Sequence, residues 1–145
     1  MCGWQLNAVG ETVAGSIDVH SDWDGASDPK VEMTFTVNVD NTGGGAGDTV
    51  DIKIVFYYKG EGETACRTQT VEDATVVGAC AQWTQFKHEF TIDHDIGAGN
   101  DLAAGDIICL KANLETDTSE VDDITINAAS FYYNKTHVGI ESGDV

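Results

Sequence analysis

The sequence predicts an all-β protein, an antiparallel β-sandwich of seven or eight strands and of jelly-roll type. Three observations lead to this prediction. Several segments alternate apolar and polar residues, no segment combines helical periodicity with a cap and a glycine stop, and the turns are rich in glycine, asparagine and aspartate. The chain has 145 residues, 16 of them glycine and one proline, and no linker or repeat divides it. We therefore predict a single domain over residues 1–145.

The first half of the chain contains two long strand segments. Residues 31–40 alternate without a break, which is typical of a strand with one buried face. A glycine-rich loop leads to a second strand over residues 50–58. Its other face becomes apolar at Val55 and Tyr57, which predicts that this strand is covered on both sides near its end. Shorter strands are predicted ahead of these two, near residues 4–9 and 16–20.

The second half continues the same pattern. A weaker strand is predicted around residues 66–71, and residues 72–81 fit either a loop or an edge strand. Strong alternation returns in three later segments, residues 86–92, 108–114 and 124–132. In the last of them the positions predicted to share the inner face are Ile124, Ile126, Ala128, Ser130 and Tyr132.

Both ends of the chain leave the strand pattern. Residues 1–14 and 135–145 are predicted to form terminal arms. The first residues, MCGWQ, have neither the basic nor the apolar stretch of a signal peptide, and no apolar run approaches the roughly 20 residues of a membrane helix. We therefore expect synthesis in a cytoplasm and no membrane partner.

The charge of the chain limits its partners further. It has 25 Asp and Glu against 7 Lys and Arg, a formal net charge of −18 at pH 7. This charge repels phosphate backbones and anionic lipid surfaces, so nucleic acid and membranes are not expected to bind. A strongly acidic surface keeps a protein soluble at high local concentration. The alternatives are cation binding and docking to a basic partner.

The chain has four cysteines, Cys2, Cys66, Cys80 and Cys109. They lack the CxxC and Cys/His spacings of zinc sites. Reduced thiols are expected in a cytoplasmic product. If the thiols are oxidised, Cys66 and Cys80 are the favoured pair of three possible pairings, because the 13 residues between them can fold back as a hairpin or loop. Cys109 lies within a strand pattern and is expected to act as a small apolar residue.

No enzymatic activity is predicted. Nucleophilic catalysis needs a serine, cysteine or threonine beside an oriented base, and no motif such as GxSxG accompanies a histidine. The chain has four histidines: His20, His88, His94 and His137. His88 is in phase with Phe86 and Phe90, which predicts a hydrogen-bonded histidine that faces inward. With 25 acids available, a pair of carboxylates suited to glycoside hydrolysis carries no information.

Asp22, Asp24 and Asp28 form the candidate metal site. Their carboxylates surround a turn at Gly25, an arrangement that suits a hard cation such as calcium. The segment lacks the bidentate glutamate of an EF-hand, and no other cofactor is predicted. A second acidic cluster comprises Asp117, Glu120, Asp122 and Asp123. The alternative for both groups is a solvated turn whose carboxylates accept backbone hydrogen bonds.

Aromatic side chains are the candidates for carbohydrate binding, because sugars stack on the faces of Trp and Tyr rings. The four candidates are Trp23, Trp83, Tyr57 and Tyr133. The alternative for each of them is packing against the hydrophobic core.

Residues 83–133 carry a recognisable order of features. These are a strand at residues 90–92, a glycine turn at 102–108, a strand at 110–114, an acidic loop at 117–123 and a final strand that closes at Tyr133. Two long strands precede them, at residues 33–35 and 52–58. In these features residues 16–134 resemble the jelly-roll modules of tailed-bacteriophage virion proteins, which include capsid cement or decoration proteins and fibre heads.

The resemblance implies a non-enzymatic structural protein of a phage virion. The expected role is that of a cement or decoration protein, made in the host cytoplasm and bound to the outer capsid surface, where it stabilises the shell of the major capsid protein. A homotrimer with terminal arms that clamp neighbouring subunits is expected. The alternative is a carbohydrate- or receptor-binding β-sandwich module of a phage fibre or an extracellular protein.

Overall fold

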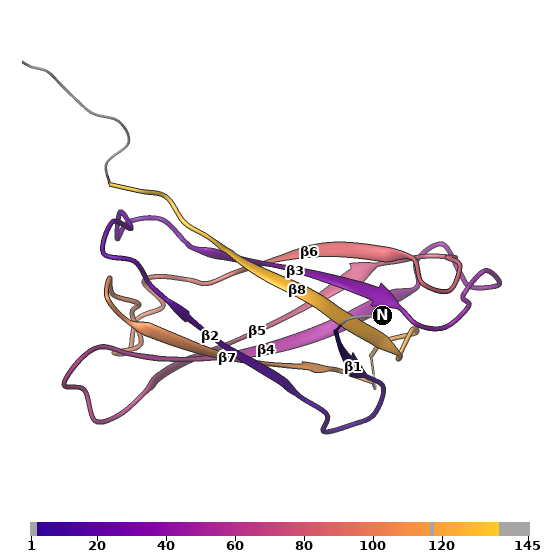
Figure 1. Cartoon of the computed structure of the whole chain (residues 1–145), viewed down its shortest axis with the longest axis horizontal. Coiled ribbons are helices and arrows are strands. Elements are labelled where there is room, and N and C mark those ends of the chain that lie inside the picture. The colour runs from indigo at the N-terminus through magenta and orange to yellow at the C-terminus, as the bar shows by residue number, and fades with distance from the viewer. Residues whose placement is uncertain (1–2, 117, 137–145) are drawn as a thin grey trace, which may run out of the picture.

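The computed structural model describes residues 3–116 and 118–136, which form two antiparallel four-stranded sheets packed face to face (Figure 1). Sheet A has the strand order β1-β8-β3-β6, and sheet B has the order β2-β7-β4-β5. No helix occurs among the described residues, so none there is long and apolar enough to cross a membrane. The predicted all-β sandwich is confirmed.

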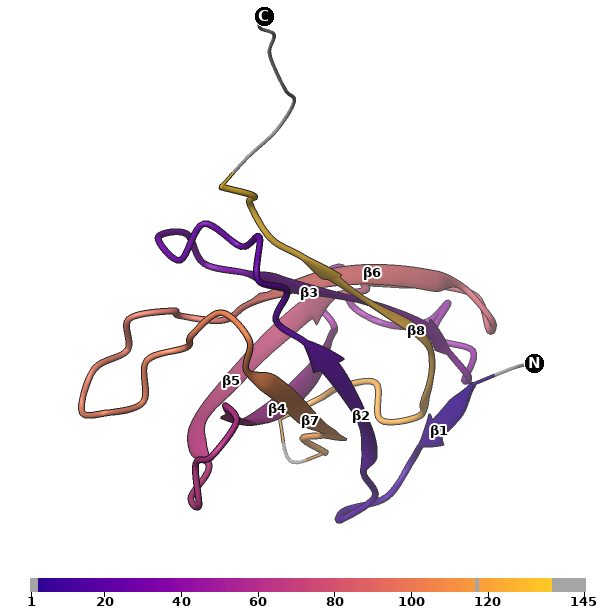
Figure 2. The same cartoon turned by 60° about the vertical axis from the view of Figure 1, so that its left-hand side comes forward.

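The eight strands are β1 (Trp4–Leu6), β2 (Val13–Asp18), β3 (Lys30–Val37), β4 (Thr49–Lys59), β5 (Arg67–Val76), β6 (Gln85–Thr91), β7 (Ile107–Leu114) and β8 (Ile124–Tyr132). Only β4 and β5 follow one another within a sheet. Every other connection crosses from one sheet to the other, and Figure 2 separates the two layers that these connections join. The loops therefore gather at the two ends of the sandwich.

The core lies between the sheets and follows the alternation in the sequence. β3 and β4 each lie between two neighbouring strands and together supply half of its largest fully buried side chains. Their fully buried residues are Val31, Met33, Phe35, Val37, Val50, Ile52, Ile54, Phe56 and Tyr58. Each such side chain contributes on the order of 1.5–3 kcal/mol by leaving water. His88 of β6 also faces inward, where its Nε2 lies 2.8 Å from the Asp73 carboxylate of β5, as the sequence predicted.

A β-bulge in β8 changes which of its residues face the core. Thr34 of β3 pairs with Ala128 of β8, but the next residue, Phe35, pairs with Ile126. Asn127 is therefore the extra residue of the bulge. A shift of one residue moves the following side chains to the opposite face of the sheet. Phe131 therefore packs against the core. The positions predicted to face inward but found on the outer face are Ala128, Ser130 and Tyr132.

Strand β5 explains why the predicted cysteine pair does not form. The segment between Cys66 and Cys80 does not fold back, because it runs as one ten-residue edge strand of sheet B. At about 3.3 Å per residue, this strand places the two thiols roughly 30 Å apart. Both are free, as is Cys109, which lies on the outer face and not in the apolar interior. Cys2 lies outside the described residues.

The predicted N-terminal arm is largely part of the sandwich. β1 pairs with β8, and β2 pairs with β7 along its whole length, so residues 3–14 contribute to both sheets. At the other end, Lys135 forms an isolated bridge with Trp23. Residues 137–145 of the second predicted arm lie outside the described residues.

Arg67, the single arginine of the chain, joins β5 to the turn that precedes β7. Its Nη2 donates to the carboxylates of Glu63 at 2.7 Å and Asp106 at 2.8 Å. Its guanidinium carbon lies 5.4 Å from the centre of the Tyr58 ring. The Asp106 side chain is only 2% exposed, so its negative charge depends on Arg67 for compensation.

Replacing Arg67 with alanine should lower the free energy of unfolding by about 3 kcal/mol, because Asp106 would stay buried without its cation. The matched control is Lys87→Ala, which removes an exposed ion pair to Glu32 at 3.1 Å and should lower it by less than about 1 kcal/mol. Urea unfolding followed by tryptophan fluorescence measures both values. Equal losses in the two variants would contradict the dependence of Asp106 on Arg67.

Candidate functional site

The loop between β2 and β3, residues 19–29, meets the loop between β6 and β7, residues 92–106, at one end of the sandwich. Backbone hydrogen bonds hold them together, among them Ile92 N–H to the Pro29 carbonyl at 2.8 Å. Pro29 and Ile92 directly flank paired strands β3 and β6, so the register of sheet A sets where the two loops meet. This contact brings together polar side chains that are distant in the sequence.

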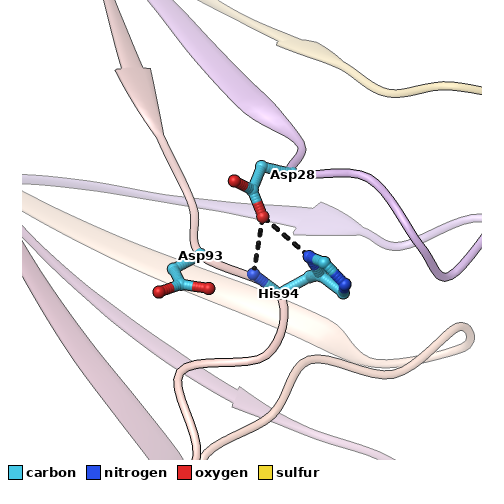
Figure 3. A group of neighbouring side chains, drawn as sticks. All are labelled: Asp28, Asp93 and His94. Carbon is cyan, nitrogen blue, oxygen red and sulfur yellow. Dashed lines mark hydrogen bonds and ion pairs between the residues drawn. The ribbon is translucent and has the colours of Figure 1, made fainter.

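Asp28, Asp93 and His94 form the closest group of potential metal ligands at this junction (Figure 3). Asp28 Oδ1 accepts from the backbone N–H of His94 at 3.1 Å and from its ring Nδ1 at 2.7 Å. The side-chain hydrogen bond from His94 lowers the pKa of Asp28, and the same bond raises the pKa of His94. The pair is therefore a charge-assisted hydrogen bond that is strongest when His94 is protonated.

One potential ligand atom from each of these three residues lies within 4.8 Å of the others, a spacing that a divalent cation can bridge. The contacts drawn in Figure 3, however, join only Asp28 and His94. The proton on Nδ1 is used in that bond, so ligation through Nδ1 would require its loss. The ion pair alone accounts for the observed geometry.

The predicted calcium site is not assembled as a group. Asp22 accepts from Tyr133 Oη at 2.9 Å, pairs with Lys135 Nζ at 3.0 Å and lies 2.8 Å from His20 Nδ1. The hydrogen bond from Lys135, with smaller contributions from Tyr133 and His20, holds the pKa of Asp22 below its usual range. This carboxylate ties the final segment of the described chain to the loop after β2.

Asp24 has a different function in the same loop. Its carboxylate accepts from the backbone N–H groups of Ala26 and Ser27, both at 3.0 Å, and from the Ser27 hydroxyl at 2.7 Å. The bond from Ala26 makes the largest contribution to its lowered pKa. Asp24 thus caps a turn, the alternative that the sequence left open. Within the described residues, the potential metal ligands grouped with Asp28 are Asp93 and His94, and not Asp22 or Asp24.

The second acidic cluster is also divided by the structure. Glu120 accepts from the backbone N–H of Thr49 at 2.8 Å and from its hydroxyl at 2.6 Å. Asp123 instead accepts from the side chains of Gln5 in β1 and of Asn38, which follows β3. Asp122 is exposed, and Asp117 lies outside the described residues. Glu120 and Asp123 therefore hold the loop before β8 in place at separate points.

The four aromatic candidates lie in different environments. Trp23 is 3% exposed, and its indole Nε1–H donates to the Ser27 carbonyl at 3.0 Å, so its ring offers no face to a sugar. Tyr133 is half-buried and bonded to Asp22. Tyr57 lies on the outer face of sheet B, whereas Trp83, 55% exposed, lies beside sheet A. The structure therefore does not bring the four into one platform.

Trp83 borders a polar hollow of about 430 Å³ at the end of sheet A where β3 ends and β6 and β8 begin. The other residues that line it are Gly3, Gln5, Asn38, Gln82, Asp123 and Thr125. These come from four separate segments of the chain, so spacing in the sequence does not reveal the group. The one feature of the sequence that points to this hollow is a tryptophan in a short turn, where bulky residues are uncommon.

Comparison with known proteins adds no relative. No family model, curated protein or solved structure matches this chain. The chemistry of its own loops, hollows and sheet faces must therefore support any functional conclusion.

Replacing Asp28 with asparagine should lower the pKa of His94, because the hydrogen bond to the Asp28 carboxylate raises it. The stabilisation from His94 is fully present below its unfolded pKa of about 6.5 and is lost as pH rises through the raised folded value. The stabilisation that the Asp28 carboxylate contributes is lost as pH falls through its lowered folded pKa. An NMR titration of the histidine ring protons measures the change, with Asp73→Asn, beside His88, as the control. An unchanged pKa of His94 in Asp28→Asn would contradict the assignment.

Proposed function

We infer that the sandwich is a jelly roll. Four antiparallel pairs support this: β1 with β8, β2 with β7, β3 with β6 and β4 with β5. This is the pairing of a single ribbon folded in half at the connection between β4 and β5. Successive pairs of that ribbon fall alternately in sheet A and sheet B, as they do when the ribbon is rolled into two layers.

We propose that the protein is a non-enzymatic structural protein of a tailed-phage virion, a cement or decoration protein on the outer capsid surface. The pairing order of the strands carries this proposal, because eight-strand jelly rolls build viral capsid domains. The same architecture also serves lectins, so the surface must distinguish them. A net charge of −18 supports solubility at high copy number before assembly.

The outer face of sheet B supports a role in assembly. Val55 and Tyr57 were predicted to be covered, yet Tyr57 is 37% exposed, and Ile107 on the neighbouring strand is 53% exposed. Tyr57 and Ile107 line a hollow of about 390 Å³ together with Cys66 and Cys109. A strand that is apolar on both faces, with no cover from the described chain, is suited to contact another subunit.

Charge favours the same face. The outward positions of β4 from Lys53 to Lys59, and all those of β7, hold no acidic residue. They contain three of the seven basic residues of the chain: Lys53, Lys59 and Lys111. Copies of a chain with a net charge of −18 repel one another. On this face the three lysines offset outward acids of the flanking strands, Asp18 of β2 and Glu72 of β5, so two copies can approach here with less repulsion than the net charge implies. We propose that this face forms the contact between copies in a homotrimer.

The isolated protein should have three times the mass of one chain in light scattering, and Tyr57→Asp should convert it to a monomer. The aspartate would place a charge in the apolar centre of the proposed contact. Ser130→Asp, at an exposed outward position of sheet A, is the matched control and should leave the trimer intact. A monomeric wild-type protein, or a trimeric Tyr57→Asp variant, would contradict this contact.

Quantitative mass spectrometry of the purified virion tests the role itself. A cement protein at three-fold positions should approach the copy number of the major capsid protein, and it should remain bound to particles whose tails have been removed. A copy number as low as that of tail fibres, or absence from the tailless particles, would overturn the proposal.

A further inference from the structure

Trp83 adopts a backbone conformation that tryptophan ordinarily avoids. Its φ is 73°, in the left-handed region that favours glycine. It occupies the third position of a turn that Thr84 N–H closes onto the Ala81 carbonyl at 3.2 Å. A residue with a side chain is strained in this conformation, whereas glycine adopts it freely.

Burial does not offset this strain. The side chain of Trp83 is 55% exposed, in contrast to Trp23, which is 3% exposed and belongs to the core. The backbone N–H of Trp83 donates to the Val37 carbonyl at 2.8 Å, a bond that any residue except proline can make. The fold therefore gains little from tryptophan at this position. A strained and exposed aromatic residue without a packing function indicates a binding site.

The polar side chains around Trp83 are held in place by one another. Asp123 Oδ1 accepts from Asn38 Nδ2 at 2.7 Å and from Gln5 Nε2 at 2.9 Å. Gln82 Nε2 donates to the Asn38 carbonyl at 2.7 Å. These bonds join the ends of β1, β3 and β8 to the turn that carries Trp83. The walls of the hollow are thus preorganised, which lowers the entropy cost of binding.

The hollow has several free acceptors. Among the described residues, no hydrogen bond reaches the second carboxylate oxygen of Asp123 or the amide oxygens of Gln5 and Gln82. Within the described part of the chain, no lysine, arginine or histidine lines the hollow. Its ligand should therefore carry several hydroxyl donors and no negative charge. Its volume of about 430 Å³ falls within the range of about 300–1,000 Å³ typical of ligand pockets.

We propose that the Trp83 hollow binds a neutral saccharide. The apolar C–H face of a sugar ring stacks on the indole, and its hydroxyls donate to Asp123, Gln5 and Gln82. Asp123 rejects sialic acids, uronates and phosphorylated sugars by charge repulsion. This site is additional to the role in the virion and rests on residues that the proposed trimer contact does not use.

The test compares the full-length protein with Trp83→Gly. On an array of neutral and anionic glycans, the wild-type protein should bind neutral glycans, and titration calorimetry with the strongest of these should show at least a tenfold loss of affinity in Trp83→Gly. The thermal midpoint of the variant should stay equal or rise, because glycine relieves the strain. Tyr132→Ala, which removes an exposed aromatic side chain at the opposite end of β8 from the hollow, is the matched control and should keep the affinity.

The other outcomes would overturn the proposal. These are no binding to any neutral glycan, binding confined to anionic glycans, or unchanged affinity in Trp83→Gly. A lower thermal midpoint in Trp83→Gly would show that Trp83 supports the fold. Dissociation of the oligomer by this substitution, measured by light scattering without glycan binding, would show instead that Trp83 anchors a protein contact.

Discussion

The contact between the inward faces of β3 and β4 supports everything else in this molecule. Each of these strands lies inside its sheet, and between them they bury side chains such as Phe35, Phe56 and Tyr58 completely. This burial fixes the register of both sheets, since a shift of one residue would turn the apolar side chains towards water. The register also sets the positions of the loops at both ends of the sandwich and of the side chains in those loops.

Most polar clusters of the protein hold loops in place. Asp24 caps a turn, Asp22 secures the last described segment, and Arg67 compensates the buried Asp106. The Trp83 turn differs from them. Its backbone is strained and its indole is exposed, and neither feature stabilises the fold. The proposed subunit contact lies on the outer face of sheet B, and the proposed saccharide site lies at one end of sheet A. The two proposed contacts therefore use separate surfaces of the protein.

The sequence predicted the strands well and the sites poorly. Strand prediction succeeded because period-2 alternation is a local pattern, and every inward position of β3 and β4 follows it. It failed after Asn127, because an extra residue in one strand is visible only against the partner strand. The aspartates around Gly25 looked alike in sequence. Their partners lie elsewhere in the chain, as His94 and Lys135 show, so only the folded structure separates a cap from an ion pair.

Trp83 and its surroundings show the same division. The sequence by itself determined the fold class, the acidic surface and the presence of an aromatic residue ahead of β6. The tertiary structure decided that Trp23 is buried, that Trp83 is exposed in a left-handed turn, and that Gln5 and Asp123 line its hollow. The physical reason is the range of the interactions. Alternation and charge are properties of neighbouring residues, whereas burial and the convergence of polar groups arise only when distant strands pair.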